Sequence, residues 1–219
     1  MEDNKLVVGY WAIQAFAHPI RLLLAYHKVS FEDKQYSYDN RDEWFLKDKP
    51  ALKTAFPNIP YVKDGDIVIT ESLATIQYAA LKTGNKDLMG KTELDQIRCT
   101  QLWGLYKDHR GELYTLAKVK YADKDKILKE KFAPFFEKIS KFLGEKEYLL
   151  GYMTWADFNH FFLIDVVTRM DPEFMKQWPN LVKYHERINN DDIKAYRKSK
   201  DYPRFYVDLA GVWNGEEKF

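Results

Sequence analysis

In the first third of the chain, short segments in which apolar and polar residues alternate are followed by segments in which apolar residues recur with a helical period. A β-type run covers 5–11, and a helix-period apolar face follows Pro19, which suits the first turn of a helix. Alternation over 31–38 predicts a second strand, and Asp64-Gly65 between two apolar runs is typical of a tight hairpin turn. A helical period returns over 72–82. With a short helix before the hairpin, this order predicts an α/β unit.

After a polar, glycine-containing stretch the pattern becomes helical throughout. Apolar positions recur with a helical period in four segments: 94–120, 125–144, 155–170 and 180–189. Thr154 and Asp157 frame the start of the third segment as a capping box, with no role expected beyond helix initiation. We therefore predict an α/β domain followed by an all-α domain, with these boundaries: residues 1–84, a linker over 85–93, and residues 94–219.

The composition of the chain indicates a folded protein and excludes several classes of function. Of the 219 residues, 46% are hydrophobic and 16% aromatic, which is too apolar for a disordered chain. The net charge of +1, from 34 basic and 33 acidic residues, gives no electrostatic footprint for nucleic acid or anionic lipid. No apolar stretch approaches the roughly 18 residues of a membrane helix, and the polar residues 1–5 do not resemble a signal peptide. The single cysteine, Cys99, fits a reducing compartment, and we expect a cytoplasmic protein.

Several catalytic motifs are absent from the sequence. It contains no glycine-rich nucleotide or phosphate loop and no G-x-S-x-G nucleophile elbow. The five histidines lack metal-ligand spacing, so we expect neither a metal nor a nucleotide cofactor. Cys99 falls within a predicted helix, which favours a buried, unreactive thiol. No cysteine occurs in 12–20, which weighs against thioredoxin-type disulfide exchange.

Three segments that are separated in sequence together indicate a site for a small peptide with a reactive sulfur. Tyr10-Trp11 places a phenolic hydroxyl at the end of the first strand. Residues 56–61, Phe-Pro-Asn-Ile-Pro-Tyr, form a rigid X-Pro corner, and Glu71-Ser72 places a carboxylate and a hydroxyl at a helix N-terminus. The free N–H groups and the dipole of a helix N-terminus favour an anion. Each segment alone has an ordinary structural role; only the combination indicates a ligand.

The order and spacing of these motifs resemble the cytosolic glutathione S-transferases, and most of all the mu class. The likeness rests on Gly9-Tyr10-Trp11, the sequence Ala-His-Pro-Ile-Arg-Leu-Leu-Leu over 17–24, residues 56–61 and Glu71-Ser72, and it extends over nearly the whole chain. It implies a thioredoxin-like N-terminal domain that binds glutathione, a helical C-terminal domain that contributes the electrophile site, and a homodimer. It also implies that the protein conjugates glutathione, as co-substrate, to small hydrophobic electrophiles. No further cofactor is implied.

By this resemblance Tyr10 is the catalytic tyrosine, which donates a hydrogen bond to the glutathione thiolate. A thiol with a pKa of about 8.5 is only slightly ionised at neutral pH, and lowering that pKa by about 1.5 units requires roughly 2 kcal/mol of anion stabilisation. One hydrogen bond to a charged acceptor contributes about 1.5–3 kcal/mol. A neutral tyrosine, with its own pKa of about 10, is therefore a sufficient donor.

The resemblance assigns the other parts of glutathione to the remaining motifs. Ser72 takes the γ-glutamyl carboxylate, and Glu71, where the mu pattern usually has glutamine, lies beside the α-amino group. Both residues are equally suited to capping the helix. The Ile59-Pro60 bond resembles the cis-proline corner of the family, which leaves the Ile59 backbone to pair with the cysteinyl part, with help from Asn58.

The glycyl carboxylate of glutathione needs donors. The resemblance implies the following residues: Trp11, Arg41, Trp44, and either Lys47 or Lys49. The chain carries one extra residue before Phe56, which leaves both lysines in competition, and we favour Lys49. Trp44 is equally suited to anchoring an exposed loop.

Further positions concern the partner subunit and the second substrate. Phe56 matches the residue that inserts into the partner, so we expect a dimer, with altered central contacts because Gln77 replaces an arginine of the mu pattern. Asp108 matches an acidic residue that reaches the neighbouring subunit's site. We expect a largely apolar electrophile pocket that draws on 108–121 and on the tail near Trp213.

These assignments predict a glutathione transferase. A glutathione-dependent isomerase or peroxidase on the same scaffold is one alternative, and a non-catalytic protein that binds apolar ligands is another. The presence of Tyr10 argues against the non-catalytic alternative.

Overall fold

The structure is a computed structural model in which residues 5–207 and 212–215 are described. Its strands are as follows: β1 (Leu6–Trp11), β2 (Phe31–Tyr36), β3 (Tyr61–Asp64) and β4 (Ile67–Thr70). They form one mixed sheet in the order β2-β1-β3-β4, with β2 parallel to β1 and with β3 antiparallel to both β1 and β4. The hairpin predicted at Asp64-Gly65 is confirmed, and Gly65 has a φ of 59°, which glycine adopts without steric cost.

The helices follow the predicted pattern, with two additions. Their bounds are α1 (His18–Tyr26), α2 (Lys49–Ala51), α3 (Ser72–Lys82), α4 (Glu93–Val119), α5 (Lys124–Ile127), α6 (Ala133–Leu143), α7 (Trp155–Met170), α8 (Pro172–Met175), α9 (Pro179–Ile188) and α10 (Asp191–Lys198). Short 3₁₀ or π turns cover 15–17, 43–48, 86–89, 121–123 and 128–132. The sequence pattern predicts neither α8 nor α10.

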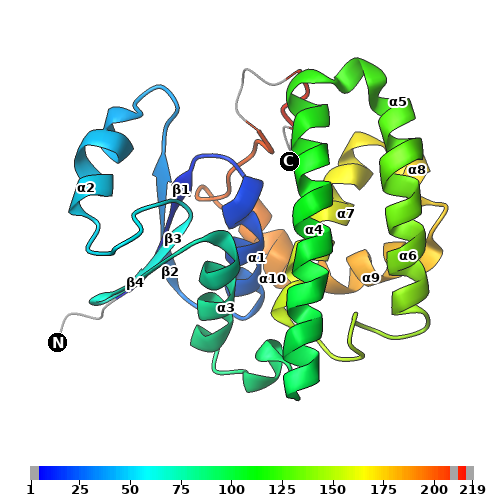
Figure 1. The fold of residues 1–219 in the computed structure, drawn as a ribbon, viewed down its shortest axis with the longest axis horizontal. Coiled ribbons are helices and arrows are strands. Elements are labelled where there is room, and N and C mark those ends of the chain that lie inside the picture. The colour runs from blue at the N-terminus through cyan, green and yellow to red at the C-terminus, as the bar shows by residue number, and fades with distance from the viewer. Residues whose placement is uncertain (1–4, 208–211, 216–219) are drawn as a thin grey trace.

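The sheet and the helical half lie side by side. Figure 1 shows the sheet at the left, the long helix α4 at the right of centre, and α1 and α3 between them. Helix α2 lies on the far side of the sheet from α4. A thioredoxin-like unit is thus followed by a helical unit, which confirms the predicted fold class. No helix in the described ranges is both long and apolar enough to cross a bilayer.

Helix α7 forms the centre of the helical half. Of its 16 residues, 14 are buried, because it contacts α1, α4, α8 and α9. The predicted capping box is confirmed: the Thr154 hydroxyl and backbone N–H both bond to the Asp157 carboxylate, at 2.9 and 2.7 Å. This cap fixes the first turn of α7, and contacts with α1 then join the helical half to the sheet.

Candidate functional site

Neighbouring strands bring the three predicted segments together at one edge of the sheet. In the register of the sheet, Gly9 of β1 pairs with Tyr61 of β3, and Tyr61 pairs with the last residue of β4. Tyr10 follows Gly9, Pro60 precedes Tyr61, and Glu71 follows the last residue of β4. A Cβ atom on Gly9 would lie 2.1 Å from the Tyr61 ring, so the close pairing requires glycine.

The Tyr10 hydroxyl is buried and neutral. Burial raises the pKa of Tyr10 above its ordinary value, against opposing effects from the Arg110 charge, a backbone hydrogen bond from Phe16 and the Arg21 charge. The side chain is 6% exposed. The phenol therefore keeps its proton at neutral pH, as a hydrogen-bond donor to an anion must.

Arg21 of α1 holds the backbone that follows Tyr10. Its guanidinium donates to the carbonyl oxygens of Ile13, at 2.7 Å, and Trp11, at 3.4 Å, and it forms an ion pair with Asp33 at 3.0 Å. Both charged side chains are almost fully buried. No local motif marks Arg21 in the sequence, although an arginine inside an apolar helical run is a signal for a buried role.

The N-terminus of α3 follows a residue with an unusual backbone conformation. Glu71 precedes the helix with a φ of 70°, an unusual value for a residue other than glycine. Its carbonyl oxygen accepts the Thr75 N–H at 2.8 Å, and its carboxylate accepts the Asn58 side-chain amide at 2.9 Å. The Ile59-Pro60 bond is cis, as the resemblance implies. Ser72 is the first helical residue and is partly exposed.

An aromatic group gathers three of the residues implied for the glycyl carboxylate. Trp11 stacks on Tyr38 with ring centroids 4.8 Å apart, and Arg41 lies 5.1 Å from the same Tyr38 ring. The Trp11 ring also lies 6.0 Å from Phe45, over which the Lys49 ammonium lies at 5.8 Å. Two cations thus flank adjacent aromatic rings at the end of β1.

Trp44 is part of the interior, and the exposed-anchor interpretation is wrong. The side chain is 2% exposed and packs with Tyr36 and Tyr61, at ring-centroid distances of 5.3 and 6.1 Å. The Tyr36 hydroxyl donates to Asp48 at 2.8 Å. Trp44 therefore stabilises the loop that carries Arg41.

Three further positions are exposed at the surface or carry no reactivity. Asp108 is exposed on α4, and Phe56 is 74% exposed on the loop before the cis bond. Cys99 is buried in α4, and burial raises the pKa of its thiol to about 11. A thiol with that pKa is protonated at neutral pH, in agreement with the predicted unreactive cysteine.

The second half of α4 and the C-terminal tail face the Tyr10 segment. The guanidinium of Arg110 lies over the rings of Phe16 and Tyr114. The Trp213 N–H donates to the Ala117 carbonyl at 2.9 Å, and the Trp213 ring stacks on Tyr121 at 6.1 Å. The tail near Trp213 thus lies against the segment 108–121. Tyr114 acts on the pKa of Tyr10, but the sequence analysis assigned a role to neither Tyr114 nor Arg110.

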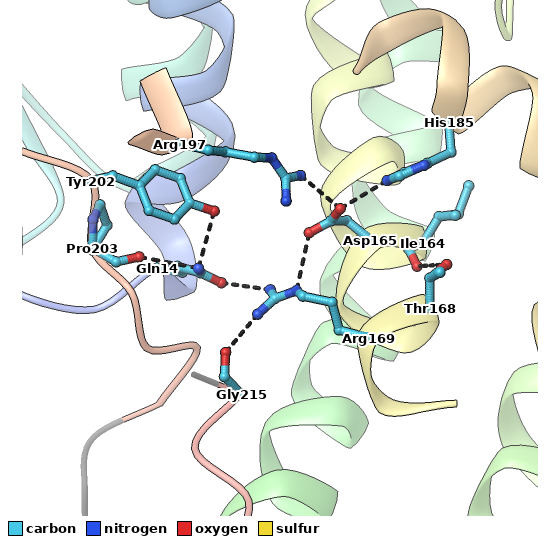
Figure 2. A network of polar contacts seen from close by, with 10 residues as sticks. All are labelled: Gln14, Ile164, Asp165, Thr168, Arg169, His185, Arg197, Tyr202, Pro203 and Gly215. Atoms are coloured by element: carbon cyan, nitrogen blue, oxygen red, sulfur yellow. Dashed lines mark hydrogen bonds and ion pairs between the residues drawn. The ribbon is translucent and has the colours of Figure 1, made fainter. Parts of the chain in front are cut away.

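A buried polar network connects α7 to the loop after Tyr10 (Figure 2). One Asp165 oxygen accepts Arg197 at 2.6 Å and His185 at 2.8 Å, and the other accepts Arg169 at 3.2 Å. Burial acts to raise the pKa of Asp165, but its three basic partners outweigh burial and hold the pKa well below its usual value.

Arg169 extends the network in two directions. It donates to the Gln14 side chain at 2.7 Å and to the carbonyl of Gly215 at 2.6 Å. Gln14 in turn donates to the Tyr202 hydroxyl at 3.2 Å and the Pro203 carbonyl at 3.1 Å. The β1–α1 loop, α7 and the C-terminal tail thus share one arginine, as Figure 2 shows.

Both halves of the chain match known family models. Residues 6–80 match the glutathione S-transferase N-terminal domain, and residues 107–200 match the glutathione S-transferase C-terminal domain.

Full-length relatives agree with these matches. The chain is 34% identical to human glutathione S-transferase Mu 2, over 96% of this chain and 99% of that protein. It is 33% identical to a glutathione S-transferase of Tyrophagus putrescentiae, over 98% of this chain and 99% of that protein. The pi-class glutathione S-transferase of Onchocerca volvulus has a similar fold, with a TM-score of 0.82 at 24% identity, over 97% of this chain and 100% of that chain. The chain belongs to the glutathione S-transferase family, and mu-class proteins are among its relatives.

Proposed function

We propose that the protein conjugates the thiolate of glutathione to small apolar electrophiles, with the Tyr10 hydroxyl donating a hydrogen bond to the sulfur. The observation that carries the proposal is a buried, neutral phenol at the end of β1, beside the cis corner at Ile59-Pro60 and the N-terminus of α3. A hydrogen bond of about 1.5–3 kcal/mol to a thiolate corresponds to a pKa lowered by about one to two units.

The remaining contacts of glutathione follow from the charges at the site. The N–H groups of α3 and the Ser72 hydroxyl take the γ-glutamyl carboxylate, and Glu71 attracts the adjacent ammonium. The Asn58 side chain donates to the Glu71 carboxylate and so orients the Glu71 side chain towards that ammonium. The Ile59 backbone pairs with the cysteinyl part.

At the other end of glutathione, Trp11, Arg41 and Lys49 bind the glycyl carboxylate. Their support is the shared aromatic group that places both cations near the end of β1. Lys47 is exposed, so Lys49 remains our choice between the two lysines. A cytoplasmic location is also part of the proposal, because a chain with one cysteine suits a reducing compartment.

Glutathione is expected to raise the melting temperature. A ligand that binds only the native state at 100 times its Kd stabilises that state by about 2.7 kcal/mol, which corresponds to about 5–10 °C for a chain of this size. Differential scanning fluorimetry with 0–10 mM glutathione would measure the shift, with free cysteine as the control ligand. In Ser72→Ala the shift should be smaller at each concentration. An unchanged melting temperature at 10 mM glutathione would contradict the proposal.

We also infer a homodimer formed by the face that carries Phe56 and the first half of α4. Phe56 is 74% exposed, and Leu94 and Ile97, three residues apart on α4, are 54% and 66% exposed. Beside them lies a shallow hollow with the following lining: Gln77, Met89, Glu93, Gln96, Ile97, Thr100 and Trp155. A ring such as that of Phe56 from a second copy fits this kind of partly apolar hollow. Asp108 on the same helix would then reach the neighbouring subunit.

Phe56→Ser is expected to weaken the dimer by about tenfold or more, because an inserted aromatic ring is a typical interface hot spot. Sedimentation velocity over a concentration series would measure the dissociation constant. Val119→Ser, which removes another exposed apolar side chain at the far end of α4, serves as the control and should leave the dimer intact. Equal dissociation constants for Phe56→Ser and wild type would exclude Phe56 from the interface.

A further inference from the structure

A nearly buried guanidinium lies beside Tyr10 without an anionic partner among the described residues. Arg110 of α4 is 6% exposed. Its Nε atom is buried and makes no hydrogen bond, and Arg110 forms no ion pair with residues 5–207 or 212–215. A desolvated cation without a counter-charge is unfavourable, so such groups are concentrated at binding and catalytic sites.

Aromatic rings hold this guanidinium next to the phenol of Tyr10. Its central carbon lies 3.4 Å from the centroid of the Phe16 ring and 5.6 Å from that of Tyr114. Phe16 also provides a backbone hydrogen bond to Tyr10, so the stack brings the positive charge within electrostatic reach of that hydroxyl, whose pKa it acts to lower. Stacking on a ring offsets part of the desolvation cost and fixes the plane of the guanidinium, while the N–H groups at its edge stay available to an acceptor.

The other polar groups around Arg110 do not neutralise it. The hydroxyls of Tyr106 and Tyr206 are buried and have no hydrogen-bond partner within the described part of the chain. Burial raises the pKa of both phenols, that of Tyr206 to about 12, against the opposing effect of the Arg110 charge. Both are therefore neutral at physiological pH, and among residues 5–207 and 212–215 the cluster carries a net positive charge.

The geometry points to Arg110 as the group that binds a negatively charged oxygen of the second substrate, so that the electrophiles of this protein are apolar molecules that carry or develop an oxyanion. This inference rests on the proposed function, since it gives the chemical class of the electrophile at the same site. It also adds one cation, flanked by the rings of Phe16 and Tyr114, to the largely apolar pocket that we expect.

An α,β-unsaturated ketone illustrates the chemistry. The thiolate sulfur forms a bond to the β-carbon, and the electron pair of the C=C bond moves so that the carbonyl oxygen becomes an enolate oxyanion. The Arg110 N–H groups donate to that oxygen as its charge develops. Solvent then protonates the α-carbon, which returns the proton that the thiol lost.

The direct test compares two ligands that differ only in charge. Binding of 4-phenylbutyrate and of its neutral isostere 4-phenylbutanamide is measured by tryptophan fluorescence for wild type, Arg110→Met and Arg110→Gln. Wild type should bind the carboxylate about 10- to 100-fold more tightly than the amide, because the hydrogen bond is charge-assisted. Both Arg110 variants should lose that preference. Arg98→Met removes an exposed arginine from the same helix and should retain the preference for the carboxylate.

A kinetic test addresses the reaction itself. The ratio of kcat/KM for trans-4-phenyl-3-buten-2-one to that for benzyl chloride should fall at least tenfold in Arg110→Met, since only the ketone places charge on an oxygen. The ratio should be unchanged in Arg98→Met. A wild-type protein that prefers the carboxylate but conjugates neither electrophile would refute the proposed function and still support the oxyanion site.

Two results would overturn the inference. The first is wild-type protein that binds carboxylate and amide equally, which needs no variant to fold. The second is an unchanged preference for the carboxylate ligand in both Arg110 variants. This result overturns the inference even if the pKa of the bound glutathione thiol rises in those variants. That second result would assign the arginine to the thiolate instead.

Discussion

Replacing Tyr10 by phenylalanine is expected to lower kcat for conjugation by about 10- to 100-fold near pH 7, with the Kd for glutathione within about threefold of wild type. The substitution removes one hydrogen bond to a charged sulfur, which corresponds to about 1.5–3 kcal/mol. It leaves the contacts proposed for the two carboxylates of glutathione unchanged. The loss should therefore appear in the chemical step and not in binding.

The pH dependence gives this prediction a specific form. In wild type, the bound thiol should ionise about one to two pH units below the value of about 8.5 for a free thiol, and in Tyr10→Phe it should return towards that value. Because burial raises the pKa of Tyr10, the phenol keeps its proton from pH 6 to 9 and should add no alkaline loss of activity in that range. Ultraviolet absorbance of the thiolate and the pH profile of kcat/KM measure both effects.

A tyrosine in the same domain serves as the control for this experiment. Tyr78 donates to Asp64 at 2.7 Å and lies on α3. Tyr78→Phe should leave kcat and the thiol ionisation unchanged. Equal turnover of Tyr10→Phe and wild type, with equal thiol ionisation, would remove the phenol from the mechanism.

Asp165→Asn is expected to lower the free energy of unfolding by about 3–5 kcal/mol, the largest stability effect of the substitutions considered. The substitution leaves Arg169, Arg197 and His185 around a neutral side chain in the interior, and breaking a buried ion pair on one side is strongly destabilising. Urea-induced unfolding at pH 7, followed by circular dichroism, measures the difference.

The difference should shrink at low pH. The pKa of Asp165 is lower in the folded than in the unfolded state, so its stabilising effect is present above the unfolded value of about 3.9 and is lost as the pH falls through the folded value. The stability of wild type should thus fall towards that of Asp165→Asn as the pH drops below the unfolded value of about 3.9. An unfolding difference that stays constant from pH 7 to pH 3 would argue against the network as its source.

A partly exposed carboxylate provides the matched control. Asp171 pairs with Lys124 at 2.9 Å, and its side chain caps α8 by accepting the Phe174 N–H at 3.0 Å. Asparagine preserves such a cap, and a solvent-accessible ion pair contributes little. Asp171→Asn should therefore cost less than about 1 kcal/mol.

Apolar periodicity predicted most of the fold because most elements bury one continuous apolar face. Helix α10 is the informative exception. It begins at the side-chain cap Asn190, yet its buried face includes Arg197, so a pattern search over apolar residues does not find it. The arginine is buried only because Asp165 of α7 lies opposite, a contact between segments that no local window contains.

The same reasoning separates the site residues that the sequence indicated from those it did not. Tyr10, Pro60 and Ser72 belong to motifs with recognisable local roles, and strand register then brings them together. Arg21 and Arg110 have no local motif. Their importance comes from partners supplied by other elements, so it is visible only once the sheet and α4 are in place.

Arg169 donates to both the backbone carbonyl of Gly215 and the side-chain amide oxygen of Gln14. Strain applied on the C-terminal side of Gly215, for example by a fusion tag, would therefore reach the turn that follows β1 through Arg169. For assays of this protein, affinity handles belong at the amino end, and kinetic constants from carboxyl-tagged material should be checked after the tag has been cleaved.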